Sequence, residues 1–176
     1  DCAVSVSDRY VMDATHADVP GRNEPVAIVA VYEPSATAWV AAAEAARFTI
    51  EWMSREVYPY PWPHMTACEG IIGGGMEYPM MTLCGGGRNV RATQGVITHE
   101  LCHMWFPMLV GSNEKRFAWM DEGTTSYFSG LVSAARQGTD GAEALSPVVN
   151  CANIPVEVHE ALNPVVVRRF EIMPDT

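Results

Sequence analysis

The chain has 176 residues, of which 48% are hydrophobic, and a formal net charge of −10. This length suffices for one sizeable core, and the apolar content predicts a globular protein and excludes a disordered one. The acidic balance argues against nucleic acid as a partner. No stretch is apolar enough to span a membrane, no targeting segment is visible, and the start at Asp1 leads us to expect a processed or excised piece.

The first part of the chain alternates strand-like and helical patterns. A helix is predicted over residues 36–57, because this segment is rich in Ala and Glu and contains neither Pro nor Gly. The alternating prolines after Tyr58 cannot continue a helix and end it. Strand-like runs lie at residues 3–6, 10–12, 26–32 and 65–68.

The second part is organised by glycines and two further helices. Three consecutive glycines at 73–75 allow a backbone conformation that another chain can approach closely. Residues 137–176 carry no recognisable chemical motif, and the pair His159-Glu160 within them is interpreted as surface. The remaining predicted features are a loop at 85–87, a helix at about 93–108, a turn at 110–116 with Glu114, Lys115 and Arg116 in solvent, and a helix at about 117–136.

The most informative pattern is a His-Glu-Leu-Cys-His sequence in the helix predicted at 93–108. His99 and His103 are one helical turn apart, so both imidazoles can reach one metal ion. Glu100 would stand beside the metal, where it can take a proton from the attacking water. Glu122 would complete a His2Glu ligand set with a fourth position left open. The pattern predicts one catalytic Zn²⁺ ion.

The five cysteines show no zinc-ribbon spacing. Cys102, within the predicted zinc helix, is interpreted as a small packed residue because it points away from the two histidines. Cys68 and Cys84 flank the segment before that helix, and a disulfide between them is left open.

Two segments together resemble one family of zinc peptidases. Residues 74–77, Gly-Gly-Met-Glu, are similar to the Gly-x-Met-Glu-Asn exopeptidase motif of the aminopeptidase N-like gluzincins. Residues 99–122 resemble that family's zinc signature, and residues 119–123 its segment around the third ligand. The resemblance covers about residues 30–136. It implies an α+β, thermolysin-like catalytic domain with a small sheet over a mostly helical lower half.

The resemblance also implies roles for single residues. Glu100 would be the general base, and the Glu77 carboxylate would bind the substrate's free α-ammonium group. Asp121, next to the third ligand, would support the metal site from behind or would instead cap or solvate its helix. The candidates for substrate binding are Gly74, Gly75, Met76 and Glu77, the two glycines by exposing backbone groups to an extended peptide.

The chain departs from the family pattern in three ways. Tyr78 stands where the family motif usually ends in Asn. The family's oxyanion-stabilising tyrosine normally lies farther past the third ligand than this chain extends, and the last tyrosine, Tyr127, is interpreted as a packing residue. The family's N-terminal β domain and C-terminal helical domain do not fit into this length. We therefore expect a single catalytic domain over residues 1–176, with a strand-rich entry (1–33), a zinc-site core (34–136) and an uncertain tail (137–176).

Three functions follow from this interpretation. The first is a zinc aminopeptidase, which acts on peptides with a free N-terminus. The second is an endopeptidase of the same clan, which would also cut N-terminally blocked peptides. The third is a zinc-bound inactive unit that needs other domains or chains to complete it. No compartment is indicated by the sequence.

Overall fold

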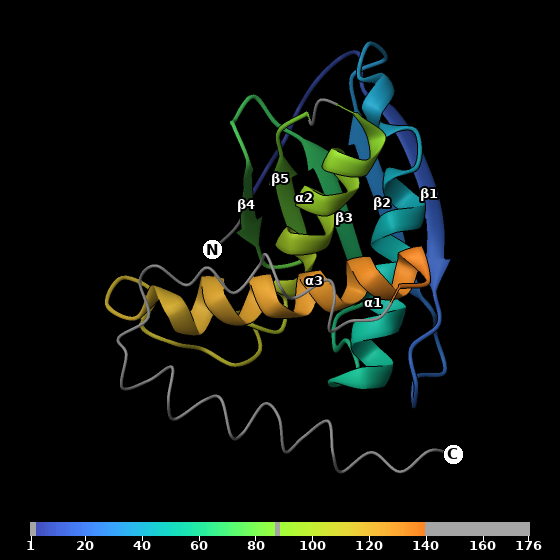
Figure 1. Cartoon of the computed structure of the whole chain (residues 1–176). Coiled ribbons are helices and arrows are strands. Elements are labelled where there is room, and N and C mark those ends of the chain that lie inside the picture. Colours follow the sequence, from blue (N-terminus) through green and yellow to red (C-terminus); the bar gives the residue numbers. More distant parts are fainter. Residues whose placement is uncertain (1–2, 87–88, 140–176) are drawn as a thin grey trace.

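The computed structural model describes residues 3–86 and 89–139. In these residues a five-stranded sheet is combined with three longer helices (Figure 1). The strands are β1 (Val11–Ala17), β2 (Val26–Tyr32), β3 (His64–Glu69), β4 (Gly75–Tyr78) and β5 (Met81–Cys84). The helices are α1 (Ala42–Glu56), α2 (Val90–Cys102) and α3 (Thr124–Gln137), with a 3-10 turn at Thr37–Trp39 and a π-helical turn at Trp119–Gly123.

The sheet is mixed, with the strand order β1-β2-β3-β5-β4. The three middle strands run parallel to one another, and both outer strands are antiparallel to their neighbours. β2 is almost continuously apolar, which is the pattern of a strand with partners on both sides. β4 is an edge strand that pairs with β5, so one of its backbone edges faces away from the sheet.

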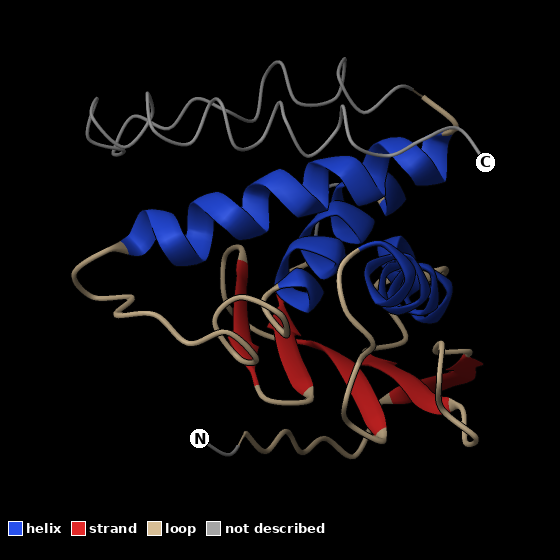
Figure 2. Cartoon of the chain, turned by 90° about the horizontal axis from the view of Figure 1, so that it is seen from below, coloured by secondary structure: helices blue, strands red, loops and turns tan. Residues whose placement is uncertain are grey.

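The helices cover one face of the sheet (Figure 2). α1 packs there because Ala42, Ala46, Ile50 and Met53 recur at helical spacing and are buried. Burial of a large side chain such as Ile50 or Met53 contributes about 1.5–3 kcal/mol. α3 lies farthest from the sheet and crosses α2 (Figures 1 and 2). The core therefore lies between the sheet and α1 and α2, and α3 closes the other side of α2.

The predicted strands at 26–32 and 65–68 are confirmed, whereas two other expectations for the N-terminal part change. The strand predicted at 10–12 begins at Val11 and continues to Ala17. The strand predicted at 3–6 is wrong, because this segment pairs with no strand of the sheet. It is held instead by side chains, for example by the 2.8 Å hydrogen bond between the hydroxyls of Ser5 and Tyr10.

The boundaries of α2 differ from the predicted 93–108 at both ends. The helix begins earlier because Oδ1 of Asn89 accepts a hydrogen bond from the backbone N–H of Ala92 at 2.9 Å and caps it. It ends at Cys102, before Pro107, which has no N–H to donate and disfavours a helical backbone at the residue before it. The short bend that follows brings the carbonyl group of Phe106 back toward the helix end.

Cys68 and Cys84 are free thiols on adjacent strands. In the parallel register Cys68 pairs with Leu83 and Glu69 pairs with Cys84. Because residues paired across a ladder point to the same face and successive residues alternate, the two cysteines project to opposite faces of the sheet. The disulfide left open by the sequence is therefore excluded by geometry. Cys102 is fully buried in the core, as interpreted from the sequence.

Within the part of the chain that the structure describes, none of the helices has both the length and the apolar character needed to cross a membrane. The predicted tail lies outside the described residues from position 140 onward, and so does His159-Glu160. The division into entry, core and tail stays a prediction.

Candidate metal centre and active site

Two histidines stand one turn apart at the C-terminal end of α2. His99 lies within the helix, and His103 is its C-cap residue. Their ring centroids are 4.9 Å apart and the rings meet edge to face. His103 is buried, whereas the side chain of His99 is 26% exposed. The helical repeat has thus placed two imidazoles on one face, at a distance that allows them to share a ligand.

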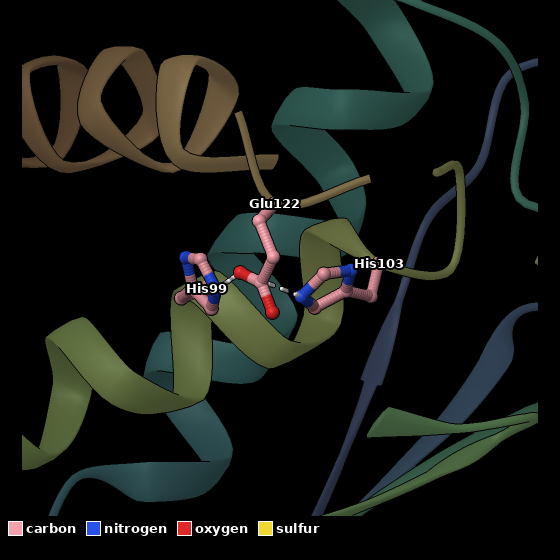
Figure 3. A group of neighbouring side chains, drawn as sticks. All are labelled: His99, His103 and Glu122. Carbon is pink, nitrogen blue, oxygen red and sulfur yellow. Dashed lines mark hydrogen bonds and ion pairs between the residues drawn. The ribbon is translucent and has the colours of Figure 1, made fainter. Parts of the chain in front are cut away.

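Glu122 approaches both histidines from the π-helical turn that precedes α3 (Figure 3). Its Oε2 lies 3.1 Å from Nε2 of His99 and 3.8 Å from Nε2 of His103. Two ligands of a tetrahedral Zn²⁺ ion bonded at about 2.0–2.1 Å would be about 3.4 Å apart. The three ligand atoms lie within 4.8 Å of one another and are a possible metal-binding group.

The buried ring of His103 is held through its Nδ1 atom. This atom is 2.8 Å from the carbonyl oxygen of Phe106 and 2.8 Å from Oδ1 of Asp121. The hydroxyl of Thr125 donates to the same carbonyl at 3.0 Å and lies 3.2 Å from Nδ1. A carbonyl oxygen only accepts, so Nδ1 carries the proton and Nε2 presents its lone pair.

The Nε2 atom of His103 provides the test of whether the site fits a metal. It is buried and has no hydrogen-bond partner among the described residues. A buried nitrogen lone pair without a partner is unfavourable in a folded protein. A Zn²⁺ ion bound with His99 and Glu122 would satisfy it, and the carbonyl behind the ring would fix its orientation. The donor set therefore fits zinc.

Glu100 lies on the side of α2 that faces the sheet and is 5% exposed. Burial raises the pKa of the Glu100 carboxyl to about 7, with a further increase from Glu77, while His99 works in the opposite direction. Gly75 on β4 lies directly against this carboxylate, and a Cβ atom at position 75 would overlap it. A carboxylate with a pKa near neutrality can both accept and return a proton at physiological pH.

Glu77 projects from β4 toward the same place. Gly75 and Glu77 are two residues apart on a strand and share a face, and Glu77 is 9% exposed. One carboxylate oxygen of Glu77 lies within 4.8 Å of the corresponding atoms of Glu100 and His103. Among the described residues it forms no hydrogen bond or ion pair. A buried carboxylate in this position is available for a ligand.

The remaining acidic groups and the histidines influence one another. Burial raises the pKa of Asp121 to about 6, against the effect of His103. Desolvation lowers the pKa of His99, but its hydrogen bond with Glu122 and the nearby carboxylates outweigh this, and the net direction is upward. The same hydrogen bond lowers the pKa of Glu122. The pair at 3.1 Å thus favours a charged imidazole next to a charged carboxylate.

Two candidates for substrate binding, Gly74 and Met76, are placed differently from Glu77, and Tyr127 is predicted only as a packing residue. The carbonyl of Gly74 accepts a hydrogen bond from the N–H of Gly85, so this group is already used within the sheet. Strand alternation places the Met76 side chain on the face opposite Glu77, where it is 39% exposed. Tyr127 on α3 lies edge to face with Phe128 at 5.2 Å. Contact of Gly74 or Met76 with a peptide would therefore involve other backbone atoms.

Sequence reasoning missed two residues of this region, Thr125 and Glu114. Thr125 could have been found, because it follows Asp121 by one helical turn and so shares its face. Glu114 carried no such signal, since it comes from a loop whose path the sequence does not specify.

The fold is α+β, with a small mixed sheet covered on one face by helices. The helical layer carries the two histidines and Glu122. This is the fold of a metallopeptidase catalytic domain, as predicted. A family model described as the peptidase family M1 domain matches residues 41–163. The chain belongs to peptidase family M1, which confirms the resemblance to the aminopeptidase N-like zinc peptidases. Zinc is the metal that this family implies.

Curated relatives and solved structures agree with the family. The chain is 31% identical over 105 residues to leucine aminopeptidase 2 of Neosartorya fischeri, which covers 57% of this chain and 17% of the relative. It is 32% identical over 102 residues to leucine aminopeptidase 2 of Aspergillus clavatus, covering 55% of this chain and 16% of the relative. A crystal structure of an M1 zinc metallopeptidase from Deinococcus radiodurans superposes with a TM-score of 0.56 at 23% identity, covering 82% of this chain and 33% of that one. The chain thus spans about a sixth of the length of these curated relatives.

Proposed function

We propose that this chain carries the catalytic site of a zinc-dependent aminopeptidase. His99, His103 and Glu122 would hold one Zn²⁺ ion, Glu100 would act as the general base, and Glu77 would bind the α-ammonium group of the substrate. The observation that carries the proposal is the buried, unpartnered Nε2 of His103, which faces Oε2 of Glu122 at 3.8 Å while its Nδ1 is held from behind. Membership in peptidase family M1 supports the same assignment.

When bound, zinc supplies a Lewis acid that polarises the scissile carbonyl and makes water acidic enough to attack near neutral pH. Glu100 accepts the proton of the attacking water and then passes it to the leaving amine. Burial of Glu100 against β4 keeps its carboxylate in position for both halves of this transfer. Because residue 75 is a glycine, β4 can pass directly over the Glu100 carboxylate, and this contact holds the carboxylate in place.

Glu77 distinguishes an aminopeptidase from an endopeptidase in this proposal. Its carboxylate is 9% exposed and lies within 4.8 Å of the Glu100 carboxylate. A charge-assisted bond from an α-ammonium group to Glu77 would hold the first peptide bond next to Glu100. An N-acetylated peptide lacks this positive charge, so the site would bind it poorly.

The oxyanion needs a further donor, and Tyr127 is not assigned this role because its ring lies against Phe128. Other domains or chains would supply it, which agrees with the small share of the curated relatives that this chain covers. The inactive zinc-bound unit is therefore the outcome expected if the chain is tested without those parts.

The test compares fluorogenic peptides with a free and an acetylated N-terminus, with zinc, with chelator, and with Glu100→Gln. Chelator-sensitive cleavage of the free peptide alone, lost in the variant, supports the proposal. Cleavage of both peptides favours the endopeptidase. Absence of cleavage together with one bound zinc per chain identifies an incomplete unit, and absence of zinc binding rejects the proposal.

A further inference from the structure

Glu114 brings a carboxylate close to Glu77 from the loop between α2 and the π-helical turn. The residue is exposed, in agreement with the predicted turn. However, one carboxylate oxygen from each of Glu77, Glu114 and Asp121 lies within 4.8 Å of the others. A residue that the sequence indicates as solvated is thus beside the buried carboxylate that faces Glu100.

This acidic group lacks a cation among the described residues. Glu77 and Glu114 form no ion pair there, and Asp121 is paired with His103. Arg116 is close to Glu114 in sequence, but its guanidinium group lies over the ring of Phe117, 5.3 Å from the ring centre. Carboxylates this close repel one another when charged. A positively charged ligand would remove that repulsion.

The buried member of the group points to the same kind of ligand. Glu77 is nine-tenths buried, and no described residue donates a hydrogen bond to it. The carboxylate oxygens of Glu77 are not fully enclosed, so a ligand that enters the site can donate to them. An ammonium group has three N–H donors and no acceptor, so two carboxylates on different sides can each accept one bond.

We propose that Glu114 is a second anchor, with Glu77, for the α-ammonium group of peptide substrates. This inference rests on the proposed function and adds to it a residue from a different segment of the chain. We favour the α-ammonium group over a basic side chain as the ligand for the following reason. Glu77, a member of the acidic group, lies next to Glu100, and Glu100 acts at the first peptide bond. The α-nitrogen is two bonds from the carbonyl carbon of that peptide bond, whereas a lysine or arginine side chain extends away from it.

The experiment measures binding and hydrolysis separately. Binding of L-leucinamide and of N-acetyl-L-leucinamide to the zinc-loaded chain is measured by calorimetry for the wild type, Glu77→Gln, Glu114→Gln and Glu56→Gln. Glu56 is also exposed and belongs to none of the acidic groups, so its variant removes the same charge elsewhere. Where the chain is active, kcat and KM are measured on peptides that begin with Ala, Leu, Lys or Arg.

We expect Glu114→Gln to weaken binding of leucinamide, and to raise KM, by about three- to tenfold, because the partner is exposed. The change in kcat should stay within about twofold, and Glu56→Gln should match the wild type. Glu77→Gln should weaken binding by at least about thirtyfold, because its carboxylate is buried.

Three results would overturn the inference in different ways. Wild-type affinity in Glu114→Gln, with binding lost in Glu77→Gln, rejects the role of Glu114 and leaves the proposed function intact. An effect confined to Lys and Arg peptides shows that Glu114 meets the side chain and rejects the α-ammonium assignment. Equal binding of the free and acetylated amides by the wild type rejects amine anchoring altogether, and the proposed function with it.

Discussion

Gly75 on β4 and Glu100 on α2 are in direct contact, and the hydrogen atom of the glycine is all that fits between them. A Cβ atom at position 75 would overlap Oε1, Cδ and Cγ of Glu100. The contact explains why a glycine opens this edge strand, since any side chain there would displace the proposed base. Gly73, by contrast, would meet nothing within 4 Å.

Replacing Gly75 by alanine should therefore reduce catalysis more than stability. The added methyl group forces Glu100 to shift, and a displacement of about 1 Å at a reacting group can reduce kcat about a hundredfold. Overpacking should lower the free energy of unfolding by about 1–3 kcal/mol. The measurements are kcat, in a form of the protein that includes the parts needed for cleavage, zinc content and a urea titration, with Gly73→Ala as the matched control. An unchanged kcat, or equal effects of the two variants, would contradict the assignment of Glu100.

Thr125 should tune zinc affinity through His103. Its hydroxyl donates to the Phe106 carbonyl that also fixes Nδ1 of His103. Thr125→Val keeps the shape and removes the hydroxyl, so we expect zinc affinity to fall about tenfold or more. Competition with a chromogenic chelator measures this, and Thr125→Ser should retain near-normal affinity. If the Thr125→Val and Thr125→Ser variants bind zinc equally well, the Thr125 hydroxyl does not help to position His103.

The two histidines could be predicted because their spacing depends only on helical geometry. Glu77 is indicated by the family resemblance, since the sequence patterns predict no strand over β4. Positions set by tertiary packing could not be predicted. The close approach of Gly75 to Glu100 needs β4 and α2 to be docked, and the place of Glu114 depends on the path of a loop. The early end of α2 reflects Pro107, whose effect reaches back to residues that are otherwise helical in pattern.

Loss of any one of the three proposed ligands should abolish stoichiometric zinc binding. His103→Gln should be the most severe, because its ring is buried and its partners Phe106, Asp121 and Thr125 would face an amide instead. Metal analysis should give one zinc per wild-type chain and less than about a tenth of that in each variant. His64→Gln, an exposed histidine on β3, is the control.

The zinc should also stabilise the fold. Because an ion that binds only the folded state raises stability by mass action, a chelator should lower the melting temperature of the wild type. His103→Gln should show no such shift. A chelator-induced shift that persists in this variant would place the metal elsewhere in the molecule.

The buried thiols should make the folded chain less stable at alkaline pH. Burial raises the pKa of Cys84 from its ordinary value near 9 to about 12, although a hydrogen bond with Thr82 opposes this. The unfolded chain therefore loses the thiol proton first, and the folded state loses stability as pH rises from about 9 toward 12. Between pH 8 and 10.5, urea titrations should show a steeper decline in the free energy of unfolding for the wild type than for Cys84→Ala.

Peptide mapping after alkylation at pH 8 provides a second measure. Cys84 and Cys102 should react much more slowly in the native chain than in urea, because both are fully buried. Equal native and unfolded reactivity at Cys84 would show that β5 opens on the time scale of the reaction and that its thiol does not experience the buried environment.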